Sequence, residues 1–137
     1  MMHRKLISDR EDVQLLVNEL YIKVRADKLL GPIFSEMITV WDRHLDHLTT
    51  FWETSLFIGR TLEHKYIGNP LQAHEKVDKV FNNSITELHF GVWLNLWYAT
   101  IDQHFEGEIA DNAKQRARKM GTFMYLKIFE ARQKKLQ

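Results

Sequence analysis

Apolar residues recur at steps of three and four along almost the whole chain, and no segment alternates apolar and polar residues over the length of a strand. This repeat places apolar side chains on one face of a helix. The clearest stripe consists of Val13, Leu16, Val17, Leu20, Tyr21 and Val24. The pattern predicts an all-α protein with about four long helices and two short ones.

Capping and turn residues set the expected helix boundaries. Ser8-Asp9-Arg10-Glu11 and Ser84-Ile85-Thr86-Glu87 both have the form of a capping box, in which the first residue caps the helix and the fourth reaches back to it. Pro32 disfavours helical geometry at Gly31 and suits the start of a new helix. Long helices are expected to start at Ser8 and Ser84, to cover 40–59, and to follow Gly107 through Ile128; short ones cover 33–37 and 71–80.

Composition narrows the class of protein. The 137 residues fit one domain, spanning residues 1–137. Lys and Arg number 19 and Asp and Glu 18, so the net charge of +1 gives no field that predicts binding to nucleic acid or an anionic membrane. The absence of cysteine excludes disulfides and thiolate metal sites. Charges interrupt every apolar run before it resembles a signal peptide or membrane span, so we expect a soluble, cytoplasmic protein.

The basic stretch Arg132-Gln133-Lys134-Lys135 is short. Cations suit the C-terminal end of a helix because they oppose its dipole. We therefore expect this stretch to be a solvated and frayed helix end.

Seven histidines and an aromatic content of 12% are the features that suggest chemistry. The chain has no H-E-x-x-H motif, since the stretch from His74 ends in Asp78, and it has no Glu-x-x-His, P-loop, G-x-G-x-x-G or G-x-S-x-G motif. A single imidazole that reaches the iron of a flat, apolar macrocycle is the simplest chemistry that uses both residue types. Spacing alone leaves alternatives open: His74 on the surface, Tyr21 as a core tyrosine, and Trp93 as ordinary packing.

Four stretches on separate helices share their order and spacing with one family. They are Leu20 to Arg25 followed by Leu30-Gly31-Pro32-Ile33-Phe34; Trp41-Asp42-Arg43-His44 with Phe51-Trp52; Tyr66 to His74; and Phe90 to Trp97. Over about residues 10 to 130 the chain resembles the third group of truncated haemoglobins. The resemblance implies a two-over-two helical sandwich with a short or missing first globin helix.

The resemblance also implies roles for particular residues. His74 matches the proximal histidine that ligates the iron of haem b. On the distal side, Tyr21, His44 and Trp93 match the positions that face the bound gas. Phe34 matches the aromatic residue that wedges against the haem. A buried tyrosine needs a hydrogen-bond partner, and in such a pocket the partner would be the gas.

The edge of the site is less well defined by the resemblance. Leu48, one turn beyond His44, is expected to face the ligand and the haem. The candidates for the haem propionates border the loop before the proximal position, with solvated surface as the alternative: Arg60, Lys65 and Tyr66. His47 is expected to face outwards or toward a propionate, and Trp52 to pack against another helix.

The expected function is reversible binding of O₂ and other diatomic ligands. Three polar groups aimed at one ligand exceed what storage requires, which favours redox chemistry on O₂, nitric oxide or peroxide. Peroxidase-like or nitric oxide dioxygenase turnover would need an external reductase, because the chain has no flavin or nicotinamide motif. Two alternatives remain: a haem module for gas storage or sensing without turnover, and an all-α interaction domain without a cofactor.

Overall fold

The computed structural model describes residues 4–60, 62, 66 and 68–134. Within these residues it contains no β-strand beyond one isolated bridge, between Lys5 and Phe105. Six helices follow in order: α1 (Arg10–Ala26), α2 (Gly31–Met37), α3 (Trp41–Leu56), α4 (Pro70–Val80), α5 (Glu87–His104) and α6 (Glu108–Lys134). The predicted all-α class is confirmed. Among the described helices, none has the length and apolar character needed to cross a membrane.

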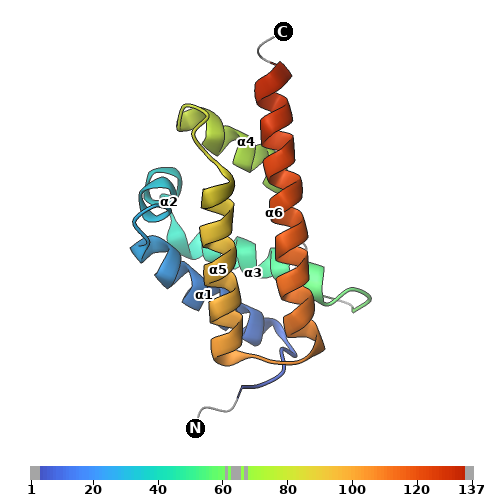
Figure 1. Cartoon of the computed structure of the whole chain (residues 1–137). Coiled ribbons are helices and arrows are strands. Elements are labelled where there is room, and N and C mark those ends of the chain that lie inside the picture. The colour runs from blue at the N-terminus through green and yellow to red at the C-terminus, as the bar shows by residue number, and fades with distance from the viewer. Residues whose placement is uncertain (1–3, 61, 63–65, 67, 135–137) are drawn as a thin grey trace.

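The helices form two pairs that cross each other (Figure 1). α1 packs on α3 in one pair, and α5 packs on α6 in the other. Contacts between α1 and α5 join the pairs, while α2 lies against α1 and α4 lies against α6. In residues 4–9 no helix precedes α1. Over the described residues the arrangement is the expected two-over-two sandwich, with no helix before α1.

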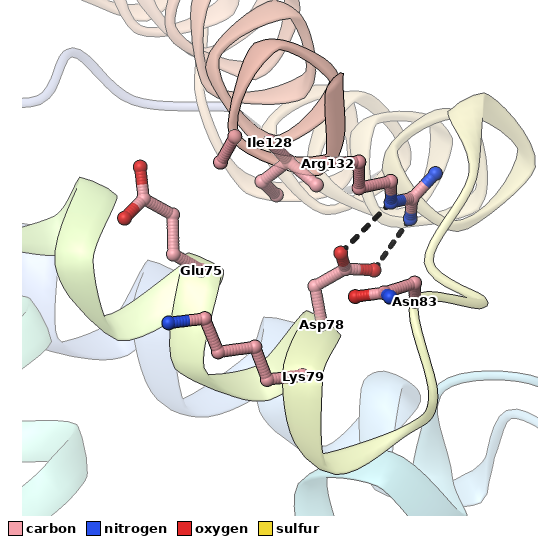
Figure 2. A pocket seen from close by; sticks show the side chains of 7 residues that line it. Glu75, Asp78, Lys79, Asn83, Ile128 and Arg132 are labelled. Atoms are coloured by element: carbon pink, nitrogen blue, oxygen red, sulfur yellow. Dashed lines mark hydrogen bonds and ion pairs between the residues drawn. The ribbon is translucent and has the colours of Figure 1, made fainter. Parts of the chain in front are cut away.

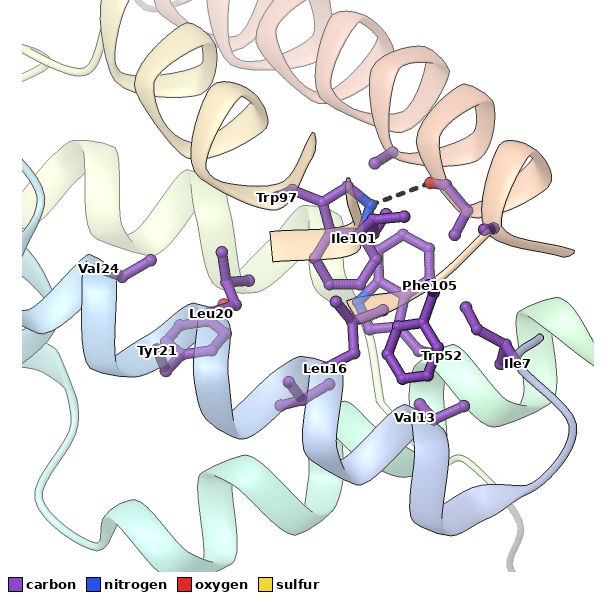
Figure 3. Packing of buried hydrophobic residues seen from close by; sticks show 14 of the residues in the cluster. Ile7, Val13, Leu16, Leu20, Tyr21, Val24, Trp52, Trp97, Ile101 and Phe105 are labelled. Atoms are coloured by element: carbon purple, nitrogen blue, oxygen red, sulfur yellow. Dashed lines mark hydrogen bonds between the residues drawn. The ribbon is translucent and has the colours of Figure 1, made fainter. Parts of the chain in front are cut away.

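The core lies where the two pairs cross, and the predicted stripe of α1 faces it (Figure 3). Val13, Leu16 and Leu20 are fully buried there. Trp52 of α3 stacks on Trp97 of α5 with ring centroids 4.4 Å apart, which confirms that Trp52 packs against another helix. The indole Nε1 of Trp97 donates to the carbonyl of Ala113 at 3.0 Å and so satisfies its one buried donor.

The predicted cap of the first helix was wrong by one residue. Asp9 is the N-cap of α1, and its carboxylate accepts the Asp12 N–H at 3.0 Å. Ser8 lies outside the helix and gives its N–H and hydroxyl to the Asp12 carboxylate, at 2.8 and 3.0 Å. Lys5 holds the same carboxylate at 2.7 Å. The side chain that bonds back to the segment before the helix is therefore that of Asp12, one residue beyond the predicted partner Glu11.

The predicted cap of the fifth helix was wrong by two residues. Thr86, not Ser84, precedes α5, and its N–H donates to Nδ1 of His89 at 3.0 Å. Ile85 is buried, with its N–H bonded to the carboxylate of Asp78 at 3.1 Å. This contact holds the chain outside the helix until it reaches Thr86.

The other boundaries lie close to those expected. α3 begins after Val40, whose side chain makes no capping hydrogen bond, and ends before the buried Phe57, three residues short of the predicted end at Gly59. α4 starts at Pro70, where the side chain of Asn69 accepts the Gln72 N–H at 3.1 Å. Asn and Asp side chains satisfy otherwise unpaired amides at helix starts in this way.

Gly31 allows α2 to start directly against the end of α1. A Cβ atom at this position would lie 2.6 Å from the carbonyl oxygen of Arg25. Glycine is therefore required by the close approach of two backbone segments, and this keeps Phe34 of α2 next to α1.

The C-terminal end of α6 differs from the expected solvated end. Arg132 forms an ion pair with the buried carboxylate of Asp78 on α4. Gln133 is exposed, and Lys135 lies outside the described residues. The prediction was wrong for Arg132 because the pattern of α6 alone does not show the partner that another helix supplies.

Candidate functional site

Tyr21 is the centre of a group of aromatic side chains that we call the tyrosine cluster, which comprises Tyr21, Phe34, Trp41, His44 and Trp93. The Tyr21 ring centroid lies 5.5 Å from that of Phe34, 6.2 Å from that of Trp41 and 5.9 Å from that of His44. Trp93 reaches the same point from α5, and its Nε1 donates to the Tyr21 hydroxyl oxygen at 3.4 Å. The structure therefore brings together Tyr21, Phe34, His44 and Trp93, four of the residues predicted from the sequence.

The hydroxyl of Tyr21 remains a proton donor at neutral pH. Tyr21 is only 6% exposed, and burial raises its pKa to about 12, against the small lowering effect of the Trp93 hydrogen bond. Since the indole of Trp93 gives its proton to the tyrosine oxygen, the tyrosine's own proton is left for a further acceptor.

His44 presents an unsatisfied nitrogen inside the tyrosine cluster. Its ring stands edge-on to Tyr21 and to Trp41, with interplanar angles of 87° and 89°. Its Nε2 atom is buried without a hydrogen-bond partner; in the described part of the chain, the only other buried side-chain nitrogen or oxygen without one is Nε2 of His104. Buried polar atoms almost always have partners, so this nitrogen fits a polar ligand beside Tyr21.

The ring of His44 is held in its neutral form. Burial lowers its pKa, and the nearby His47 lowers it further. The unfolded chain binds this proton more readily than the folded chain. The stability that depends on neutral His44 is therefore complete above the ordinary histidine pKa of about 6.5, and it is lost as the pH falls through that value toward the lowered one.

This pH dependence can be measured by urea unfolding. Between about pH 7.5 and about pH 5 we expect the free energy of unfolding to fall less in His44→Gln than in the wild type, because the variant cannot take up the proton. Histidines that do not interact with His44 contribute equally in both proteins and cancel in the difference. An identical fall in both proteins would show that His44 is not kept uncharged by folding.

Trp41 is in contact with a cation, the side chain of Arg25. The guanidinium carbon of Arg25 lies 4.2 Å from the centre of a Trp41 ring, a cation–π contact. Sequence reasoning did not single out Arg25 for this site. The available signal was its position four residues after Tyr21, which places both on one side of α1.

His74 belongs to a different group of side chains, on α4. Its Nδ1 atom lies 2.6 Å from the carbonyl oxygen of Pro70. A carbonyl only accepts, so Nδ1 must bear the proton and the neutral ring has its lone pair on Nε2. Burial lowers the pKa of His74, with the Pro70 hydrogen bond acting in the opposite direction, which favours this neutral form. His74 thus presents a nitrogen suited to binding a metal ion.

The ring of His74 packs against a side chain of α5. It is stacked on Phe90 with centroids 6.1 Å apart and an interplanar angle of 25°. Phe90 in turn meets Tyr125 of α6 edge-on at 6.2 Å. Phe90 was part of a motif in the sequence, but its contact with His74 was not predicted.

The remaining predicted residues lie at the edge of these groups. Leu48 is half-buried and packs against the core. Tyr66 lies against His47, with ring centroids 4.8 Å apart, and against Phe51 at 5.1 Å. It is therefore placed beside α3 and does not belong to the tyrosine cluster.

Of the two basic residues predicted to bind the propionates, the structure describes one, Arg60. The guanidinium of Arg60 donates to the carbonyl of Ser8 at 2.7 Å and lies over the Phe57 ring at 4.2 Å. It is therefore engaged with the segment just before α1. Lys65 lies outside the described residues.

The two crossed helix pairs, with a short helix against one pair and no helix before α1 in the described residues, define a truncated globin fold. The chain superposes on the crystal structure of a group III truncated haemoglobin from Campylobacter jejuni with a TM-score of 0.78 and 26% identity, over 92% of this chain and 95% of that one. It is 29% identical to the group 3 truncated hemoglobin ctb of the same organism over 113 residues, which are 80% of this chain and 82% of that protein. No protein-family model matches the chain. The chain is a homologue of the group 3 truncated haemoglobins, as the resemblance predicted.

Proposed function

We propose that this chain is a single haem domain that holds one haem b through His74 and binds O₂ or another diatomic gas beside Tyr21. The observation on which the proposal depends is the hydrogen bond from Nδ1 of His74 to the Pro70 carbonyl, because it leaves the lone pair on Nε2. Homology to the truncated haemoglobins supports a haem-binding role. When bound through His74, haem would supply an iron that can take up a diatomic gas.

The tyrosine cluster supplies donors for the gas. Tyr21 is protonated, and Trp93 fixes its hydroxyl oxygen from α5. His44 adds a neutral imidazole whose Nε2 has no partner in the protein. Apolar walls from Phe34 and Trp41 strengthen these hydrogen bonds because they exclude water.

The hydrogen-bond partner of His74 influences the fate of a bound gas. A carboxylate partner would make the histidine ring more basic, whereas Pro70 offers only a backbone carbonyl. His74 is therefore a weaker electron donor than a histidine paired with Asp or Glu. This favours gas binding and retention as the primary activity.

Redox chemistry on O₂, nitric oxide or peroxide is the second candidate. The observation that favours it is the convergence of Tyr21 and His44, with Trp93 orienting the tyrosine hydroxyl, since polar groups held at one point polarise an O–O bond beside them. Such turnover requires electrons from a separate reductase, which we propose as a partner.

Addition of haemin to the purified protein tests the primary proposal. A sharp Soret band that saturates at one haemin per chain is expected, followed after reduction by reversible spectral change with O₂. A chain that stays colourless would overturn the proposal. Steady consumption of peroxide or nitric oxide in the presence of an artificial electron donor would establish the second candidate, and stoichiometric reaction without turnover would exclude it.

A further inference from the structure

Asp78 of α4 is buried and forms a two-point ion pair with α6 (Figure 2). It is 3% exposed. Nε of Arg132 donates to one carboxylate oxygen at 2.9 Å, and Nη2 donates to the other at 2.5 Å. This fork-to-fork geometry fixes direction as well as distance.

The same two residues also hold the turn between α4 and α5. Nη2 of Arg132 donates to the carbonyl of Ile85 at 2.6 Å, and the Asp78 carboxylate accepts the Ile85 N–H at 3.1 Å. The backbone carbonyl of Asp78 accepts the N–H of Asn83 at 2.7 Å. Asp78 is therefore the point at which α4, the following turn and α6 are joined.

His74 lies four residues before Asp78, one turn earlier on the same helix. α4 packs chiefly on α6, so the Asp78–Arg132 pair is a main determinant of where α4 lies. The His74 ring is held against the same helices through Phe90 and Tyr125. Backbone and ring of the histidine are thus both positioned against α5 and α6.

Stability alone is a poor explanation for this pair. Removing the Asp78 carboxylate from water costs several kcal/mol, and apolar residues of similar size often stabilise a fold as well as a buried ion pair or better. What the pair provides that apolar packing does not is a defined register between two helices.

We propose that Asp78 and Arg132 are positioning residues for His74. They fix the position of α4 against α6 and thereby the geometry of the bond from His74 to the haem iron. This inference rests on the proposed function. It predicts that a change in the Asp78–Arg132 pair alters the bond between His74 and the haem iron as well as the stability of the fold.

Resonance Raman spectroscopy of the reduced, gas-free haem protein tests this directly, because the iron–histidine stretching band reports the proximal bond. In Asp78→Asn we expect this band to shift and broaden. We also expect haem transfer to an excess of another apoglobin to become roughly 10- to 100-fold faster, as for other partners that orient metal ligands.

Glu53→Gln is the matched control. Glu53 pairs with Arg10 between α3 and α1 at 3.1 Å, and the two side chains are 9% and 20% exposed, against 4% and 22% for Asp78 and Arg132. This variant should lower the stability while leaving the iron–histidine band in place. Arg132→Lys keeps the charge but not the fork, so it should shift the band in the same direction by less.

The outcomes separate the two proposals. Wild-type protein that takes up no haem would overturn the proposed function, and this inference with it, before any variant is made. Wild-type protein with a normal band that is unchanged in Asp78→Asn would overturn this inference alone. If Asp78→Asn does not fold, Arg132→Lys decides in its place. An equal shift in Glu53→Gln would reduce the effect to general loosening and would also overturn the inference.

Discussion

His74→Ala protein should show no Soret band after addition of haemin and removal of the excess. The variant lacks the nitrogen that the Pro70 hydrogen bond leaves free to bind metal. Loss of an outer partner of a metal ligand already weakens binding by roughly 10- to 100-fold, so loss of the ligand itself should weaken haem retention by more than about 100-fold. Absorption spectra before and after gel filtration measure the effect.

Two controls make the result specific. His104→Ala removes a histidine from the C-terminal end of α5, outside the tyrosine cluster and the contacts of His74, and should keep the full Soret band. Imidazole added to His74→Ala should restore part of the band, because the free ring can occupy the space left by the side chain. A His74→Ala protein that retains haem as tightly as the wild type would contradict the assignment of the ligand.

The fold followed from the spacing of apolar residues because burial of one face is a local and repeated signal. The α1 stripe shows this, since Val13, Leu16 and Leu20 are all fully buried as predicted. The caps were less predictable because neighbouring polar residues compete for them. Ser8 and Asp9 are both good cap residues, and the outcome was decided by Lys5 and Asp12, which bind each other.

The tyrosine cluster was accessible from the sequence because Tyr21 lies on the apolar stripe and the matching motifs on α3 and α5 supplied His44 and Trp93. The support of His74 was not accessible. In the sequence, Asp78 stands out only as the residue that breaks a metalloprotease motif, and the pattern of α6 places Arg132 in solvent. These two residues lie 54 positions apart, so their ion pair depends on the fold and leaves no trace in local spacing.

Tyr21→Phe should release O₂ faster than the wild type by roughly 10- to 150-fold. A gas with partial negative charge would accept a hydrogen bond from the tyrosine hydroxyl, and a hydrogen bond to a charged group contributes about 1.5–3 kcal/mol, which corresponds to this range of rates. The phenyl ring keeps the contacts with Phe34 and His44, so the change isolates the hydroxyl. Stopped-flow displacement of O₂ by carbon monoxide measures the rate.

Trp93 distinguishes a direct role of Tyr21 from an indirect one. Its indole reaches the tyrosine oxygen at 3.4 Å, so Trp93→Phe should release O₂ faster by a smaller factor, through loss of orientation. If Trp93 acts only through Tyr21, the double variant should release O₂ no faster than Tyr21→Phe. Additive effects would mean that the indole also donates to the gas directly. Tyr98→Phe, on α5 outside the cluster, should leave the rate unchanged.

An unchanged rate in Tyr21→Phe would contradict the role of the tyrosine hydroxyl. It would assign the donor role to His44 instead. Among the described residues of the tyrosine cluster, His44 has the buried side-chain nitrogen, Nε2, that lacks a hydrogen-bond partner.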